Sequence, residues 1–107
     1  MTPAEMIADL DAALLVAGST VQLRKTNSAV GQVTARARVR FYKPDEIVGI
    51  IQQGDSKVVL SPTGLDAFGV PPQNGFVLVD GSPRRIILPN PIKIQDTLVR
   101  IELQVRG

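Results

Sequence analysis

The chain has 107 residues, of which 44% are hydrophobic, and this size and composition are typical of one globular domain with a single core. Its 12 Lys and Arg residues against 10 Asp and Glu residues leave a formal net charge of +2, too small to indicate nucleic-acid binding by itself. Cysteine and histidine are both absent. Their absence excludes disulfides, thiol nucleophiles, Cys/His zinc sites and catalytic pairs that need histidine.

The first segment, residues 3–17, is predicted to be a helix. Thr2 can cap it, Pro3 suits its first position, and Glu5 completes a capping box. Apolar residues then recur at spacings of three and four, which places them on one face: Met6, Ile7, Leu10, Ala13, Leu14 and Ala17. Gly18 favours a helix end at that point. This acidic segment lacks the basic start of a signal peptide, so we expect a protein made in the cytoplasm.

After Gly18 the hydrophobic period changes from 3.6 to 2, which indicates strands. The longest alternating segment puts one set of residues on an inward face, namely Val33, Ala35, Ala37, Val39 and Phe41. Shorter strands are expected near residues 21–24, 57–60, 76–79, 84–88 and 99–105. Asp80-Gly81 favours a tight hairpin turn. Residues 61–69 favour one helical turn capped by Ser61, and residues 89–91 favour a bend.

These elements predict a mainly β fold with a single domain over residues 1–107. No strand–helix–strand alternation occurs, so a parallel sheet is not expected. We expect a small antiparallel β-barrel or sandwich over residues 20–106, with the N-terminal α-helix packed against it. The prolines are expected in turns or at sheet edges, namely Pro62, Pro71, Pro72, Pro83, Pro89 and Pro91.

Carboxylates are the only conventional acid–base groups that the composition leaves. Asp45 and Glu46 are adjacent and would point apart on an extended chain, while Asp66 and Asp80 lie where Asp commonly forms turns. No spacing resembles a metal-binding loop or a phosphate-binding glycine motif. We therefore expect no enzymatic activity, and no catalytic, cofactor-binding or metal-binding residues.

A loop is expected over residues 44–55, between a Pro-Asp-Glu start and a Gly-Asp end. Its middle follows neither the helical nor the strand period. One interpretation is a buried strand, and the other is a protruding loop whose apolar residues become buried against another subunit. The assembly candidates of the second interpretation are Ile47, Val48, Gly49, Ile50, Ile51, Gln52 and Gln53.

Arg36, Arg38 and Arg40 alternate with the inward residues of the longest strand, so they share its other face at a spacing of about 7 Å. One interpretation is a solvated strand surface. The other is a face directed at DNA or an acidic partner, which makes a small nucleic-acid-binding β-barrel the alternative function. The few aromatic residues do not favour base stacking. A weaker third possibility is peptide binding by strand addition at an open sheet edge.

Three segments carry a resemblance to a known family. They are residues 42–62, which include the Gln53-Gly54-Asp55-x-x-Val58 turn, the hairpin at residues 77–81, and residues 99–107. In these segments, and in size and strand order, the chain resembles the small head–tail joining proteins of tailed bacteriophages, also called head-closure or stopper proteins. The resemblance covers most of the chain and is weakest over the N-terminal helix.

The resemblance implies a non-enzymatic β-barrel that forms a homo-oligomeric ring in the virion neck, where it helps to close the filled head and joins it to the tail. Its partners would be other copies of itself, the portal or adaptor ring, tail terminator or other tail proteins, and the packaged double-stranded DNA; no membrane is implied. The family's long loop, which lines or gates the channel, corresponds by position to residues 44–55. Contacts between subunits would be heterologous, as in closed rings.

Overall fold

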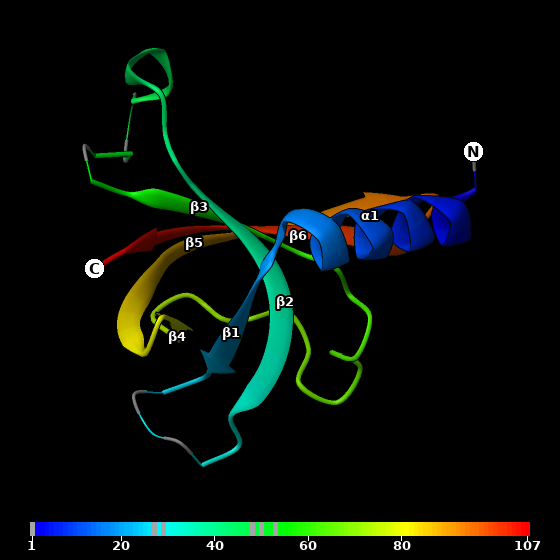
Figure 1. The fold of residues 1–107 in the computed structure, drawn as a ribbon, viewed down its shortest axis with the longest axis horizontal. Coiled ribbons are helices and arrows are strands. Elements are labelled where there is room, and N and C mark those ends of the chain that lie inside the picture. Colours follow the sequence, from blue (N-terminus) through cyan, green and yellow to red (C-terminus); the bar gives the residue numbers. More distant parts are fainter. Residues whose placement is uncertain (1, 27, 29, 48, 50, 53) are drawn as a thin grey trace.

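A computed structural model describes residues 2–107 except Asn27, Ala29, Val48, Ile50 and Gln53. Its elements are α1 (Pro3–Ala17), β1 (Ser19–Arg24), β2 (Val33–Phe41), the short 3₁₀ helix η1 (Pro44–Glu46), β3 (Ser56–Leu60), β4 (Phe76–Val79), β5 (Ser82–Ile94) and β6 (Thr97–Arg106). The strands form a closed antiparallel barrel in the order β1-β2-β3-β6-β5-β4, with α1 outside it (Figure 1). The predicted fold class is confirmed.

The start of α1 has the capping box that the sequence predicts. The Glu5 amide donates to the Thr2 hydroxyl at 3.2 Å, and the Thr2 amide donates to a Glu5 carboxylate oxygen at 3.2 Å. At the other end, the extended Gly18 donates its amide to the Leu14 carbonyl at 2.9 Å. A Cβ atom at Gly18 would collide with that carbonyl oxygen and lie 2.9 Å from the carbonyl of Ala37. The glycine is needed because the helix end lies against β2.

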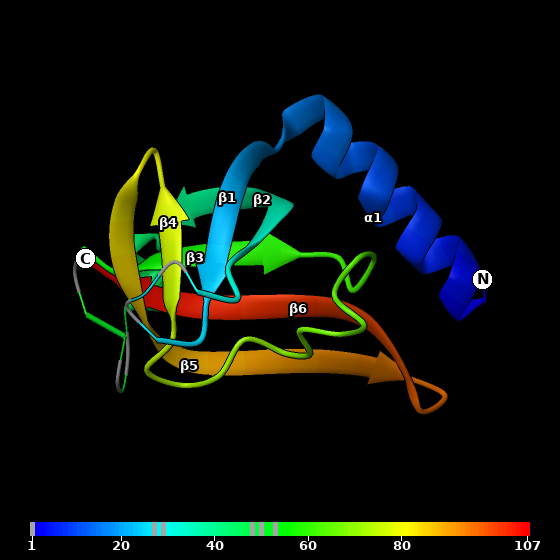
Figure 2. The same ribbon diagram turned by 90° about the horizontal axis from the view of Figure 1, so that it is seen from below.

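The packing of α1 is uneven along its length. The helix packs against β2 and β6, and Leu14 is its one buried residue. Met6, Ile7 and Leu10 are half-buried, since the N-terminal half extends beside the projecting β5–β6 hairpin (Figure 2). A groove of about 530 Å³ separates this half from the hairpin. The predicted apolar face is therefore only partly covered by the barrel.

The core fills the barrel interior. Its fully buried side chains come from all six strands, namely Val21, Leu23, Ala37, Val58, Leu60, Val77, Ile86, Ile101, Leu103 and Val105. Leu65 and Phe68, between β3 and β4, complete the cluster. The prediction that Phe41 points into the core is wrong, because Phe41 ends β2 beyond the core and is 68% exposed.

Two local predictions need correction. The helical turn expected within residues 61–69 is confined to residues 65–69, where the Gly69 amide donates to the Leu65 carbonyl at 2.7 Å, and Gly64, with a φ of +81°, separates it from Ser61. Ser61 still accepts a hydrogen bond from the Thr63 amide. Residues 89–91 do not bend the chain away from the sheet. β5 continues through them, with Pro89 opposite Leu103 and Pro91 opposite Ile101.

β5 is bounded by two tight turns, and two prolines lie on its edge that is unpaired among the described strands. Asp80 and Gly81 have φ values of +52° and +80°, which fit the expected tight hairpin turn. Gln95 and Asp96, at +51° and +63°, form a second tight turn that the sequence analysis did not predict. Beyond Arg85, β5 pairs only with β6 among the described strands, so Pro89 and Pro91 lie on an edge strand as expected. Strand addition is disfavoured there because neither proline has an N–H to donate.

Replacing Leu103 with Ala is expected to lower the free energy of unfolding by about 2–5 kcal/mol, because the substitution leaves a cavity in the barrel core. Leu15→Ala is the matched control, since Leu15 is 71% exposed on α1. The control should change the unfolding free energy by less than about 1 kcal/mol. Urea unfolding followed by circular dichroism measures both. Equal losses in the two variants would contradict the barrel assignment of β6.

Candidate functional site

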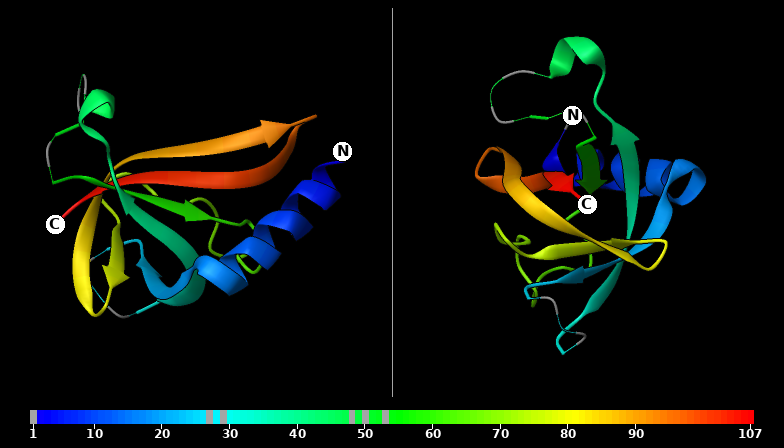
Figure 3. Two further views of the ribbon diagram at one scale, coloured as in Figure 1. Left: turned by 45° about the horizontal axis from the view of Figure 1, so that its top comes forward. Right: turned by 90° about the vertical axis from the view of Figure 1, so that its left-hand side faces the viewer.

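The 44–55 loop leaves the barrel after β2 and returns at β3. It stands beyond the end of the barrel where the C-terminus also lies (Figures 1 and 3). After η1, its described residues form neither strand nor helix. Ile47 and Ile51 are half-buried, while Gly49 and Gln52 are exposed. The remaining candidates, Val48, Ile50 and Gln53, lie outside the described residues.

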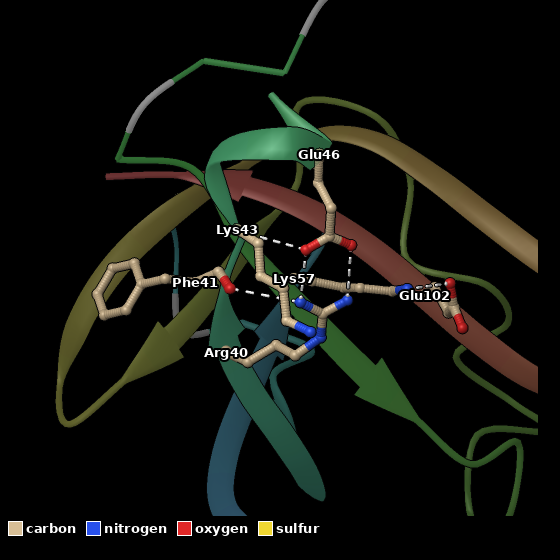
Figure 4. Close-up of polar contacts among 6 residues, drawn as sticks. All are labelled: Arg40, Phe41, Lys43, Glu46, Lys57 and Glu102. Carbon is tan, nitrogen blue, oxygen red and sulfur yellow. Dashed lines mark hydrogen bonds and ion pairs between the residues drawn. The ribbon is translucent and has the colours of Figure 1, made fainter. Parts of the chain in front are cut away.

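The first end of the loop is held by an ion pair with two parallel hydrogen bonds. The two terminal nitrogens of Arg40 lie 3.1 Å from the two carboxylate oxygens of Glu46, and the Lys43 amide donates to Glu46 at 2.8 Å (Figure 4). The Arg40 hydrogen bonds, followed by the Lys43 amide, lower the pKa of Glu46 from 4.5 to about 2. This carboxylate fixes η1 against the end of β2.

The second end of the loop is held by a buried carboxylate. Asp55 is 2% exposed, and its carboxylate accepts hydrogen bonds from Arg106 Nε at 2.8 Å, Arg106 Nη2 at 3.0 Å and Gln104 Nε2 at 2.8 Å. The loop contributes a fourth bond, from the Gln52 amide at 2.9 Å. The bonds from Arg106, above all, lower the pKa of Asp55 from 3.8 to about 2 in spite of burial. Asp55 therefore ties the loop to β6.

The register of the sheet explains why these groups meet. Arg40 lies opposite Lys57, which lies opposite Gln104, so the three residues form an outward-facing row across β2, β3 and β6. Lys57 pairs with Glu102 at 2.8 Å, and Arg100 pairs with the same carboxylate at 2.9 Å. Figure 4 shows the Lys57–Glu102 pair beside the Arg40–Glu46 pair. The loop thus stands at one end of a network of ion pairs on the outer surface.

The three arginines of β2 lie on one face, but they have different surroundings. Arg36 donates to the carbonyls of Leu14, Leu15 and Gly18 at 2.8–3.3 Å, where a cation is favoured by the C-terminal end of the helix dipole. Arg40 binds Glu46. Arg38 is exposed, with no hydrogen bond or ion pair to the described part of the chain. Two of the three charges therefore have structural partners.

The role of Asp55 was not predicted from the sequence. Gly54-Asp55 has the composition of a turn, and Gln104 and Arg106 alternate with the apolar residues of the last strand, although Gln104 is buried. The useful signal was the placement of Gln104 and Arg106 two residues apart on one strand face. Their shared partner lies 49 and 51 residues away and becomes evident only when β3 and β6 are paired.

The carboxylates of Glu46 and Asp55 hold the loop in place. Asp55 and Glu46, each with a pKa of about 2, are ionised near neutral pH and cannot act as general acids there. A hollow of about 240 Å³ lies at the foot of the loop, with Tyr42, Ile51 and Leu88 among its lining residues. The described residues include no helix long and apolar enough to cross a membrane. The arrangement positions a loop with apolar residues at one end of a stable barrel.

Comparison with known proteins gives no assignment. No protein-family model matches the chain, and no curated protein or solved structure is significantly similar to it. Function must therefore be argued from the loop, its two anchoring carboxylates and the sequence resemblance.

Asp55→Asn is expected to lower the free energy of unfolding by about 2–3 kcal/mol, since it removes a buried charge that accepts bonds from Arg106. Asp45→Asn is the control, because Asp45 is exposed at the same loop and makes no hydrogen bond or ion pair with the described residues. Its effect should stay within about 0.5 kcal/mol. Urea unfolding at neutral pH would show equal midpoints for the two variants if Asp55 had no anchoring role.

Acid should destabilise the wild-type chain in part through Asp55. The folded pKa of about 2 is below the ordinary value of 3.8, so the unfolded chain binds this proton more readily. The stabilisation is complete well above pH 4 and is lost as pH falls towards about 2. Urea midpoints measured between about pH 6 and pH 2 should fall less steeply for Asp55→Asn than for the wild type. Parallel curves would contradict the assigned pKa shift.

Proposed function

We propose that this chain is a structural, non-enzymatic subunit of a ring in the neck of a tailed bacteriophage. The ring would join the DNA-filled head, at its portal or adaptor, to the tail, and the 44–55 loop would help to close the channel. Packaged double-stranded DNA would pass through that channel during ejection. The proposal follows from the sequence resemblance and assigns the closing role to the 44–55 loop.

The observation that carries the proposal is the way in which the loop is held. Both ends are fixed by charged side chains, Glu46 on Arg40 and Asp55 on Arg106, while the segment between them has no regular structure where it is described. A channel loop needs fixed ends so that forces from DNA or a partner act on its middle without unfolding the barrel. The half-buried Ile47 and Ile51 provide apolar surface that further contacts can cover.

The alternative from the sequence, a small nucleic-acid-binding β-barrel, relied on Arg36, Arg38 and Arg40. Arg36 binds the end of α1 and Arg40 binds Glu46, so only Arg38 of this set is available to a phosphate without breaking a bond. The ring proposal is therefore preferred. Tight binding of the purified chain to short duplex DNA, weakened about equally by neutralising each of the three arginines, would reverse this preference.

Imaging tests the location directly. Cryo-electron microscopy of particles from the phage that encodes the chain should show a ring of barrels between the portal region and the tail. The copies should fit the barrel with α1 outside, and the loop should face the axis. A fully traced neck that lacks this chain would overturn the proposal.

Shortening the loop tests its role. Replacing residues 47–51 by a short Gly-Ser linker, with Glu46, Gln52 and Asp55 kept, should change the unfolding free energy of the purified chain by less than about 1 kcal/mol, because no fully buried described side chain and none of the Asp55 bonds is removed. Particles carrying this variant should assemble but lose their DNA, as measured by nuclease sensitivity. The matched control replaces residues 26–30, in the loop between β1 and β2. DNA retention equal to that of the control would contradict a closing role.

A further inference from the structure

Charge is unevenly divided between α1 and the barrel. The helix carries Glu5, Asp9 and Asp11 and no Lys or Arg. The remainder of the chain holds all 12 basic residues and 10 − 3 = 7 acidic residues, which gives the helix a formal charge of −3 and the remainder +5. A chain with this division can be attracted to other copies of itself if the two regions lie on different sides.

One side of α1 is exposed, although Glu5 accepts the capping bonds from Thr2 and Asp9 lies at the edge of the groove beside the β5–β6 hairpin. Glu5, Asp9, Ala12 and Val16 recur at spacings of four, three and four, so they share one side of the helix, and all four are exposed. Val16 is 88% exposed. Asp9 makes no hydrogen bond or ion pair with the described residues. We call these four residues the acidic helix face; its small Ala12 lets another surface approach closely.

A row of basic residues crosses three neighbouring strands of the barrel. Arg24 of β1 lies opposite Phe76 of β4, which lies opposite Arg85 of β5, so the three side chains point outward together. Strand spacing puts the two arginine backbones about 10 Å apart with the aromatic ring between them. We call these three residues the β4 face. Arg24 binds the neutral Gln32 and Arg85 binds the neutral Asn74, so no described carboxylate pairs with either.

The barrel order separates these two faces. α1 packs against β2 and β6, which flank β3 in the order β1-β2-β3-β6-β5-β4. The three remaining strands, β1, β4 and β5, are those that carry the β4 face. In Figure 2, α1 extends to one side of the molecule while β4 lies on the other. Two complementary surfaces on opposite sides of one subunit generate a head-to-tail assembly, which closes into a ring when the rotation fits.

We propose that the acidic helix face of one copy docks onto the β4 face of the next copy. Asp9 would approach Arg85 and Ala12 would lie over the half-buried Phe76, because the helix rise between Asp9 and Ala12 and the strand spacing between Arg85 and Phe76 are both about 5 Å. The occupant of the β4 face is thus a second copy of this chain. The inference rests on the proposed ring and specifies which surfaces hold its subunits together.

Charge reversal of single residues tests the contact. The purified chain is examined by sedimentation and by concentration-dependent NMR shifts at low salt, up to about 1 mM, where a contact with a millimolar dissociation constant is half-populated. Asp9→Lys and Arg85→Glu should each weaken self-association about tenfold or more. Lys93→Glu and Asp66→Lys are matched controls, because both residues are exposed and lie outside the two faces and the 44–55 loop. Arg24→Glu serves as a second variant if Arg85→Glu unfolds.

Mixing the two variants gives the decisive result. In the mixture, Lys at position 9 of one copy can pair with Glu at position 85 of the other. The second contact joins the unchanged Asp9 of the Arg85→Glu copy to the unchanged Arg85 of the Asp9→Lys copy. An equimolar mixture should therefore associate within about threefold of the wild type. Helix-to-helix pairing would leave the self-association of Arg85→Glu unchanged, so it cannot produce loss in both single variants followed by recovery in the mixture. Absence of wild-type association at about 1 mM, or association that ignores both reversals, would overturn the inference.

These outcomes are separate from those of the proposed function. A ring seen in the virion neck whose contacts avoid the acidic helix face would overturn only this inference. Absence of the chain from the neck, together with rescue in the mixture, would overturn only the neck location. If Arg85→Glu instead lowers affinity for duplex DNA and leaves self-association unchanged, the β4 face is a nucleic-acid surface and the inference fails.

Discussion

Closure of the sheet is the constraint on which every other feature depends. The pairing of β1 with β4 joins the two ends of the sheet, so that side chains from six strands converge on one interior. Closure also assigns positions on the outside. In the closed barrel, α1 lies on one side, the β4 face lies on the opposite side, and the 44–55 loop lies at one end. A chain of this size can therefore present three distinct surfaces with a single small core.

The two anchors of the loop differ in how firmly they hold. Asp55 is almost fully enclosed and accepts four hydrogen bonds from the described residues, so opening this end would break its bonds to Arg106, Gln104 and the Gln52 amide. Glu46 is more open to solvent, and salt and water weaken its pair with Arg40. The β3 end of the loop is therefore the fixed end, and η1 is the end that can move at lower cost.

The elements that follow from local rules could be predicted from the sequence. The capping box at Thr2 and Glu5, the alternation in β2 and β6, and the Asp80-Gly81 turn depend on neighbouring residues alone. The errors arose where distant segments decide the outcome. Pro89 and Pro91 remain in a strand because their partner strand leaves their nitrogen side unpaired, and Phe41 is exposed because the core ends before it. The candidate residues of the loop were chosen from sequence patterns. The carboxylate that anchors the loop to β6, Asp55, could be found only from the register of β3 against β6.

The place of β6 in the barrel has a consequence for biosynthesis. Among the six barrel strands β6 comes last in chain order, yet it lies between β3 and β5 and contributes Ile101, Leu103 and Val105 to the core. On the ribosome, α1 and the β1–β2 hairpin can form early from local contacts, but the sheet cannot close until residues 97–106 have left the exit tunnel. Until then the edges of β3 and β5 that face β6 are unpaired and the apolar interior is open to water, which are the features that favour aggregation of a nascent β protein.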